Sequence, residues 1–188
     1  QWVNLRCLSW RKNHQNYDPQ NHLHAYCVAM TLLTPLSLGS RLVQRLHRRY
    51  PQELAWLPAG EPTAAHLHTT YALLRQTYPE VADALRVLRQ LVLERLVVLD
   101  CEQQAPLNTI TQSMTALAEF SLNKALEEAL ARVDQRHGSP MTAQGVRAQL
   151  WVVGMGKLGA GELNVSSDID LVYVFDEDGQ TQGVDNGR

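Results

Sequence analysis

Apolar residues recur at helical spacing from about residue 20 to residue 137. Steps of three and four residues are clearest after Pro79 and Glu80, where proline suits the first turn of a helix. The stripe that these steps predict consists of Val81, Leu85, Leu88, Val92, Leu96 and Leu99. We therefore expect this helix to contribute one continuous face to the core.

A second long helix is predicted from a cap at Asn108 or Thr109 to the helix-ending run at residues 138–140. Its expected buried stripe consists of Met114, Ala118, Leu122, Leu126, Ala129 and Val133. Shorter helices, separated by prolines, are predicted over residues 22–33, 38–49 and 63–76. The first three quarters of the chain therefore form a helical region.

The pattern changes in the last forty residues. Residues 150–153 are a short apolar run that ends in glycine, and residues 169–175 alternate at the spacing of a strand. The segment between them, 154–164, is too short and too rich in glycine for a long crossover helix. The predicted fold class is α+β, with a mainly helical region at 1–145 that leads into an α/β unit at 146–188.

The composition limits what this α/β unit can bind. The chain has 188 residues, of which 45% are hydrophobic, so it can bury a core. Its formal net charge of −2 gives no general basic surface of the kind that binds nucleic acid. Any phosphate chemistry must therefore come from a local site.

Cysteine usage and hydropathy indicate the compartment. Cys7, Cys27 and Cys101 are widely separated and odd in number, which favours neither a disulfide framework nor a zinc site. No apolar run approaches the roughly 20 residues of a membrane span, and the first residues of the sequence lack the charged-then-apolar layout of a signal peptide. We expect a cytoplasmic protein without a membrane partner. Because the chain starts at Gln1 and stops soon after a strand, we also expect a fragment of a longer protein.

The glycine-rich segment admits several interpretations. Gly154, Gly156 and Gly159 satisfy the G-x-G-x-x-G pattern after a strand, as in dinucleotide-binding folds. That fold needs a full helix before the next strand, and only residues 160–167 are available. The P-loop pattern also fails, because no Gly-Lys-Ser/Thr follows the required spacer. A strand, a glycine turn, a short helical turn and a second strand fit the sequence better.

Asp168 and Asp170 stand at the predicted start of the second strand. Side chains two residues apart on a strand point to one face, so the two carboxylates should repel unless a divalent cation such as magnesium lies between them. The glycines would let backbone N–H groups approach phosphate, with Ser167 as a hydroxyl donor and Lys157 as a cation. Each feature alone is more often a solvated pair, a tight turn or a surface charge. Their combination favours a nucleotide and metal site.

Three runs in this region are long and specific: Val-Gly-Met-Gly-Lys-Leu-Gly at 153–159, Gly-Glu-Leu-Asn at 161–164 and Ser-Ser-Asp-Ile-Asp-Leu at 166–171. Together they closely resemble the signature of the glutamine synthetase adenylyltransferase family, which belongs to the DNA polymerase β-like nucleotidyltransferase superfamily. The family carries two such domains in one chain, and these runs resemble the N-terminal copy. The resemblance covers about residues 50–188 and implies an incomplete polymerase β-like unit after the helices.

The resemblance implies a bacterial enzyme that regulates nitrogen assimilation. The N-terminal copy removes AMP from a tyrosine of glutamine synthetase by phosphorolysis and releases ADP, whereas the C-terminal copy attaches AMP from ATP. Both use magnesium. By this resemblance Asp168 and Asp170 are the catalytic metal ligands, residues 154–159 bind phosphate, and Ser167 assists. The implied partners are glutamine synthetase, a PII signalling protein, ATP, ADP and phosphate.

Two departures and two alternatives accompany this interpretation. Ala160 stands where the family commonly has glycine, and the third carboxylate that the superfamily takes from a later strand lies outside the chain. Asp176, Glu177 and Asp178 are poor substitutes at the far end of the same strand, so we expect this chain alone to lack turnover. The alternatives are an attaching nucleotidyltransferase with another acceptor, or a helical interaction module with a degenerate nucleotide site.

A basic stripe on the predicted helix at 38–49 has two interpretations. Its members are Arg41, Arg45, Arg48 and Arg49, with His47 among them. Basic residues near the end of a helix match the helix dipole and are usually solvated. Such patches also steer acidic partners, which would make the stripe a docking surface for glutamine synthetase or a PII protein.

Overall fold

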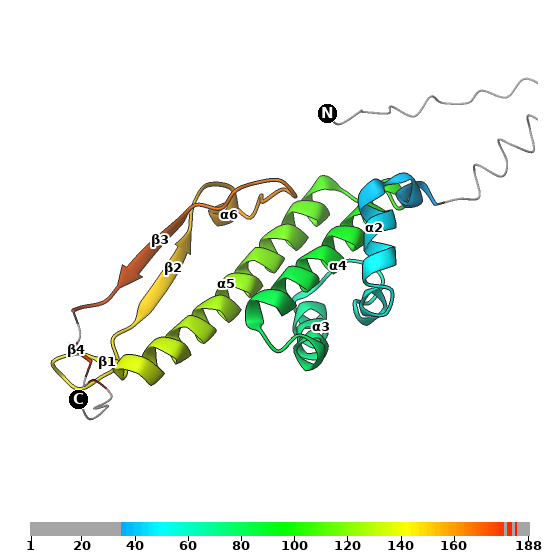
Figure 1. Ribbon diagram of the computed structural model, residues 1–188. Helices are drawn as coiled ribbons and strands as arrows, with labels where there is room; N and C mark the ends of the chain where they lie inside the picture. Colours follow the sequence, from blue (N-terminus) through cyan, green and yellow to red (C-terminus); the bar gives the residue numbers. More distant parts are fainter. Residues whose placement is uncertain (1–34, 179, 182, 184–188) are drawn as a thin grey trace, which may run out of the picture. The chain divides into compact units, whose positions relative to one another are not determined.

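The computed structural model describes residues 35–178, 180, 181 and 183, and all of these except Pro35 belong to one compact unit, Leu36–Arg188 (Figure 1). The helix predicted at 22–33 lies outside the described residues, as do Cys7 and Cys27. The described part is mainly helical with a few short strands, so the predicted α+β class is confirmed. Among the described residues no helix has both the length and the hydropathy that crossing a bilayer requires.

The helices α2 to α5 follow one another along the chain. The elements are η1 (Leu36–Gly39), α2 (Arg41–Arg49), η2 (Glu53–Trp56), α3 (Ala64–Thr77), α4 (Val81–Cys101) and α5 (Leu107–His137). The Ser40 side chain caps α2, and Thr63 and His66 form a capping box at the start of α3. The shorter helices predicted at 38–49 and 63–76 are thereby confirmed.

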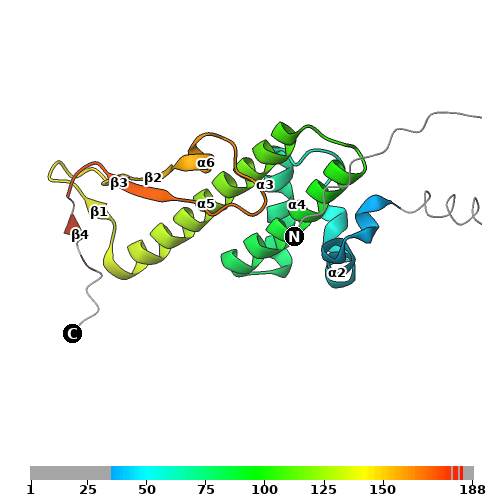
Figure 2. The same ribbon diagram turned by 90° about the horizontal axis from the view of Figure 1, so that it is seen from above.

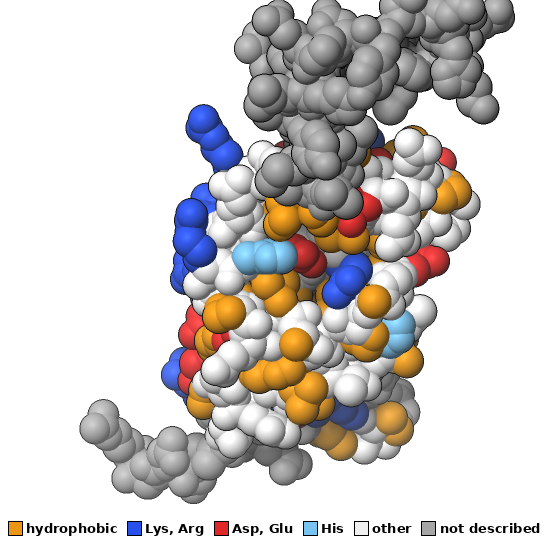
Figure 3. Space-filling model, turned by 90° about the vertical axis from the view of Figure 1, so that its right-hand side faces the viewer, with side chains coloured by type: hydrophobic (Ala, Val, Ile, Leu, Met, Phe, Trp, Pro, Cys, Tyr) orange, Lys and Arg blue, Asp and Glu red, His pale blue; other side chains and the backbone are white. Residues whose placement is uncertain are grey.

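Helix α2 carries the predicted basic stripe. The helix has no acidic residue in its first turn and ends in His47, Arg48 and Arg49, whereas Val43 and Leu46 face the core. Figure 3 shows the side of the molecule where α2 lies in Figure 1, and there Lys and Arg side chains gather along one edge. The stripe is therefore an exposed surface opposite the buried face of the helix.

Helix α4 lies at the centre of the helical core, in contact with α2, α3 and α5 (Figures 1 and 2). The predicted stripe is buried except at Leu85, which is half-buried. Leu91 and Leu93, outside that stripe, are buried as well. A helix with neighbours on several sides hides more than one face, which a single stripe does not anticipate.

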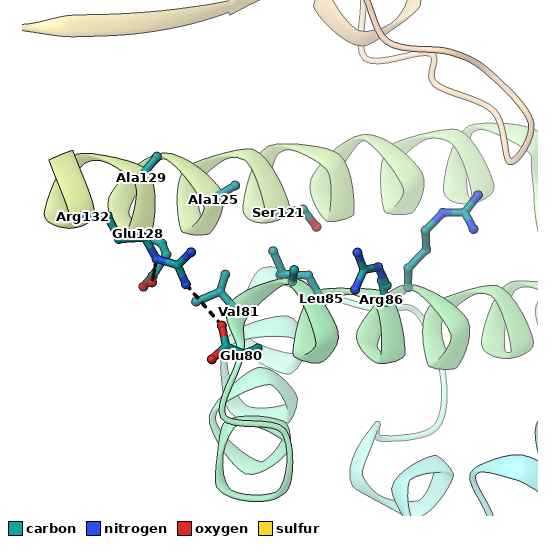
Figure 4. Close-up of a pocket in the computed structure, with 11 residues that line it drawn as sticks. Glu80, Val81, Leu85, Arg86, Ser121, Ala125, Glu128, Ala129 and Arg132 are labelled. Atoms are coloured by element: carbon teal, nitrogen blue, oxygen red, sulfur yellow. Dashed lines mark hydrogen bonds and ion pairs between the residues drawn. The ribbon is translucent and has the colours of Figure 1, made fainter.

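Helix α5 ends at His137, before Gly138, as predicted, but it differs from its prediction at its start and in the burial of its second half. It begins at Leu107, after Pro106 with a φ of −55°, so the caps predicted at Asn108 or Thr109 are wrong. Its buried residues end at Phe120, and Val133 is 49% exposed. In this half of α5 a groove separates the helix from the start of α4, and the small Ala125 and Ala129 line it (Figure 4).

The strands form two small antiparallel sheets. Strand β1 (Pro140–Met141) pairs with β4 (Gln180–Thr181), and β2 (Leu150–Gly154) pairs with β3 (Leu171–Phe175). In the second pair, Leu150 lies opposite Phe175 and Gly154 lies opposite Leu171. The short helix α6 (Gly156–Gly159) connects β2 to the loop before β3. Antiparallel pairing is incompatible with a parallel βαβ crossover, so the dinucleotide-fold interpretation does not apply.

The start of β3 corrects one prediction. The apolar alternation placed the strand from residue 169, but β3 begins at Leu171, after both aspartates. Only the Asp170 carbonyl extends the ladder, accepting from the Met155 N–H at 2.9 Å. The change from helices to strands occurs near Pro140, and the division into domains at residue 145 stays a prediction.

Candidate functional site

The turn after β2 depends on glycine for steric reasons. A Cβ at residue 159 would lie 2.5 Å from the Gly154 carbonyl oxygen, which is backbone and cannot turn aside. Gly156 has a φ of +54°, in the left-handed region that disfavours other residues. These two glycines allow α6 to start directly after the strand and fold back against it. The predicted strand, glycine turn and short helical turn are therefore all present.

Asp170 lies against this turn. Its Oδ2 is 3.9 Å from the position that a Cβ on Gly156 would occupy, although the two residues are far apart in sequence. The carboxylate and the open backbone at Gly156 thus share one exposed surface. This is the juxtaposition that a phosphate between a turn and a metal-binding carboxylate would require.

Lys157 and Ser167 meet beside the turn. The Lys157 Nζ lies 3.4 Å from the Ser167 Oγ, and that hydroxyl donates to the Asn164 Oδ1 at 2.6 Å. The Asn164 carboxamide also accepts the Ser166 N–H at 3.3 Å. Asn164 therefore organises the loop before the aspartates. No role was predicted for it, although an asparagine two residues before a serine is a typical turn signal.

Asp168 faces a groove between the loop and the helices. It lines a groove with Ser167 and Ile169, opposite residues of α4 and α5 that include Arg89. The side chain is exposed, as is that of Asp170. Because both residues precede β3, the argument from strand alternation does not place Asp168. The position of Asp168 therefore depends on the loop and on the contacts that attach this loop to the helices.

Two leucines and one hydrogen bond fasten the loop. Leu158 and Leu163 are 5% and 3% exposed and join the core formed by the helices. The Leu163 N–H donates to the Thr115 Oγ1 at 3.3 Å, and the Thr115 hydroxyl donates to the Thr111 carbonyl at 2.9 Å within α5. Thr115 was missed, because nothing in the local sequence links it to a loop far along the chain.

The donor set fits magnesium. Asp168, Asp170 and Ser167 offer the hard oxygen atoms that this ion prefers, and the exposure of both carboxylates leaves room for water or phosphate oxygens. The described residues contain no group of three or more His, Cys, Asp or Glu side chains that could hold a metal ion. Asp176 accepts the Gln149 N–H at 3.0 Å and the Glu177 N–H at 2.9 Å, so it caps the strand end.

Sequence comparisons match this region to known proteins. The family described as glutamate-ammonia ligase adenylyltransferase matches residues 31–188. The bifunctional glutamine synthetase adenylyltransferase/adenylyl-removing enzymes of Ralstonia nicotianae and Burkholderia mallei are 40% and 44% identical over 79% and 69% of this chain. The enzyme of the same description from Chromobacterium violaceum is 48% identical over 55% of the chain. The matched segment spans only 12% to 17% of the length of these three relatives.

Proposed function

The chain belongs to the glutamate-ammonia ligase adenylyltransferase family, and from this premise we propose that it carries part of a magnesium-dependent nucleotidyltransferase site that acts on glutamine synthetase. The observation that carries the proposal is the placement of the Asp170 carboxylate against the glycine turn at Gly156. The names of the relatives supply the substrate protein and the adenylyl group. The polymerase β-like fold of the complete unit is part of the same proposal.

In finer detail, we propose that this part of the protein removes the adenylyl group. An oxygen of hydrogen phosphate attacks the phosphorus of the AMP attached to tyrosine, and the bond from phosphorus to the tyrosine oxygen breaks. The proton of the phosphate ends on that oxygen, so the products are ADP and the unmodified tyrosine side chain of glutamine synthetase. The support is the resemblance of the runs at 161–164 and 166–171 to the N-terminal copy of the family. The relatives are named for both directions, so the direction needs an experiment of its own.

The residues divide the work by their chemistry. Asp168 and Asp170 would hold magnesium, which when bound neutralises phosphate charge. The backbone at Gly156 admits a phosphate oxygen because no Cβ intervenes, and Lys157 adds a positive charge beside it. Ser167, already bonded to Asn164 and Lys157, would orient the ligand. None of these groups is a base for the attacking phosphate, which positioning alone would align.

The test is a chimera in which residues 31–188 replace the matching segment of the Ralstonia nicotianae relative. We expect phosphate-dependent release of ADP from adenylylated glutamine synthetase, with loss of about 100-fold or more in Asp168→Asn and Asp170→Asn. Asp176→Asn is the matched control, because an amide oxygen can still cap the strand end. It should keep its activity.

The same variants decide between the candidate functions. Loss of attachment with retention of removal would favour the alternative, an attaching nucleotidyltransferase that uses this half-site. If neither activity changes, the region is an interaction module with a degenerate nucleotide site. We expect the 188-residue chain alone to release no ADP, because its described residues provide no third metal-binding carboxylate beside the pair.

Regulation and compartment complete the proposal. We propose a PII signalling protein as a regulatory partner and the cytoplasm as the site of the reaction. The support is the family resemblance and, for a reducing compartment, the exposed free thiol of Cys101. The first proposal is tested by measuring whether the full-length chimera with the Ralstonia nicotianae relative co-purifies with PII at different glutamine concentrations.

A further inference from the structure

Four arginines from two helices line one surface hollow. Arg45 and Arg49 come from α2, and Arg86 and Arg89 come from α4. We call these four residues the arginine cluster. The remaining lining residues are Leu46, Tyr50 and Gln90, so no carboxylate of the described residues borders the hollow. Folding has therefore gathered positive charges that lie about forty positions apart in the sequence.

Little of this charge is neutralised by neighbours. Within the described residues only Arg86 of the cluster has an ion pair, with Asp83 at 2.7 Å, and both side chains are well exposed, so the pair is weak. Glu94 of α4 is engaged by His47 at 2.8 Å. The Arg49 guanidinium lies 5.3 Å from the centre of the Tyr50 ring, which holds it beside the hollow. Such a concentration of like charge favours an anionic partner.

The cluster adjoins the candidate site. Arg89 lines the hollow and also lines the groove that contains Ser167 and Asp168. The same arginine borders the groove between α4 and α5 that Figure 4 shows. A chain bound along the cluster would thus continue directly toward the aspartates. A docking site so placed would present a neighbouring residue of the bound protein to the catalytic groups.

We propose that the arginine cluster docks an acidic segment of the protein substrate, a partner class that rests on the proposed function. Arg45 and Arg49 are spaced i and i+4, and Arg86 and Arg89 are spaced i and i+3, so each helix offers its pair on one face. Guanidinium groups bind carboxylates through two parallel hydrogen bonds. Two such rows beside the apolar Leu46 and Tyr50 suit a peptide segment with several carboxylates better than a single small anion.

The experiment measures binding of the 188-residue chain to adenylylated glutamine synthetase by biolayer interferometry at low and high salt. The double variant Arg45→Glu with Arg89→Glu should weaken binding about tenfold or more and reduce its salt dependence. The matched control is Arg41→Glu with Arg48→Glu, which makes the same charge change at exposed positions of α2 outside the hollow. It should change affinity less than about threefold. Far-UV circular dichroism confirms that both variants fold.

Other outcomes of this experiment would attribute the loss of binding to a different cause. Equal losses in both double variants would mean that only overall charge matters, which overturns the proposal. It is also overturned if the cluster variant loses binding of tripolyphosphate or of a single-stranded oligonucleotide while still binding glutamine synthetase normally. If the unmodified chain binds a labelled oligoglutamate peptide through the cluster but does not bind glutamine synthetase, acidic docking stands and the proposed function fails.

Discussion

Helix α4 and the β2–β3 hairpin are both apolar in sequence, but they are buried to very different degrees. Leu88, Leu91 and Val92 of α4 have no exposed surface. In the hairpin Trp151 is 49% exposed and Tyr173 is 63% exposed. The helix is surrounded by neighbouring helices, whereas the hairpin has strands of five residues and only its own partner strand as a hydrogen-bonded neighbour among the described residues.

The difference shows two ways of fixing a structure. The helical core is held by close packing, so its stability depends on side-chain volume. The hairpin and its glycine turn are held by backbone geometry, by two buried leucines and by one hydrogen bond to Thr115. Substitutions in the two regions should therefore differ in which property they change, global stability or the local order of the site.

The largest effect is expected in the core. Leu88→Ala removes a fully buried side chain and leaves a cavity, which should lower the free energy of unfolding by about 2–5 kcal/mol. Urea denaturation followed by circular dichroism measures the change. Leu107→Ala, the same substitution at a residue that is 76% exposed, should have almost no effect. Equal effects at both positions would contradict the assigned packing.

Gly159→Ala should distort the turn. The new Cβ would meet the Gly154 carbonyl oxygen at 2.5 Å, so the backbone must shift, at a cost of about 3 kcal/mol. Hydrogen exchange should speed up across residues 154–164 while α4 stays protected. Gly39→Ala, where no atom lies within 4 Å of the added Cβ, is the control. Unchanged exchange around α6 would refute the close approach.

Thr115→Val tests the link between the two regions. Valine keeps the volume but removes the acceptor, so the buried Leu163 N–H loses its partner at a cost of about 1–2 kcal/mol. Exchange of that amide should rise more than exchange in α4. Thr111→Val is the matched control, because among the described residues its hydroxyl donates a hydrogen bond only within its own helix, to the Asn108 carbonyl. A larger change in the control variant would contradict the proposed attachment of the loop through Thr115.

The smallest effect is expected at the junction between α5 and the strands. Asp134 accepts two hydrogen bonds from Arg147, at 2.5 and 3.2 Å, and this partner lowers the pKa of the carboxyl. A lowered folded-state pKa stabilises the protein above the unfolded value, about 3.9, and this contribution is lost as the pH falls through the folded value. Asp134→Asn should therefore lower the unfolding midpoint slightly at neutral pH.

Measuring the unfolding midpoint of Asp134→Asn as a function of pH tests whether the ionised carboxylate is the cause. The stability difference between the wild type and Asp134→Asn should shrink as the pH falls below about 4, where Asp134 of the unfolded wild type becomes protonated, and should be lost once the pH is below the lowered pKa of the folded state. Asp83→Asn, at an exposed i, i+3 pair with Arg86, gives the control for a solvated ion pair. A difference that is constant down to pH 2 would exclude ionisation as its cause.

The sequence predicted the helices and strands whose formation depends on neighbouring residues in the chain. The helices at 41–49, 64–77 and 81–101 and the two strands follow from spacing and capping residues. The predicted stripe on α5 failed toward Val133 because burial depends on which neighbours cover a helix. The placement of Asp168 and Asp170 before β3 was not predicted, since strand ends are set by the partner strand.

Features made by distant residues could not be predicted. The glycine runs and the aspartates identified the candidate site as a linear segment, but its attachment through Thr115 joins positions 48 residues apart. The arginine cluster likewise combines α2 with α4, and the sequence pointed only to the α2 half. Spacing within one helix carries no information on which residue of another helix lies beside it.

The attachment of the loop also defines how the site can open without unfolding of the whole unit. Undocking would expose Leu158 and Leu163, break the bond to Thr115 and leave the helical core intact, at a cost of about 3–6 kcal/mol for the two leucines. Such an opening lies below global unfolding in free energy and exposes one particular amide. The hydrogen-exchange rate of the Leu163 N–H therefore reports how often the loop that carries the aspartates opens.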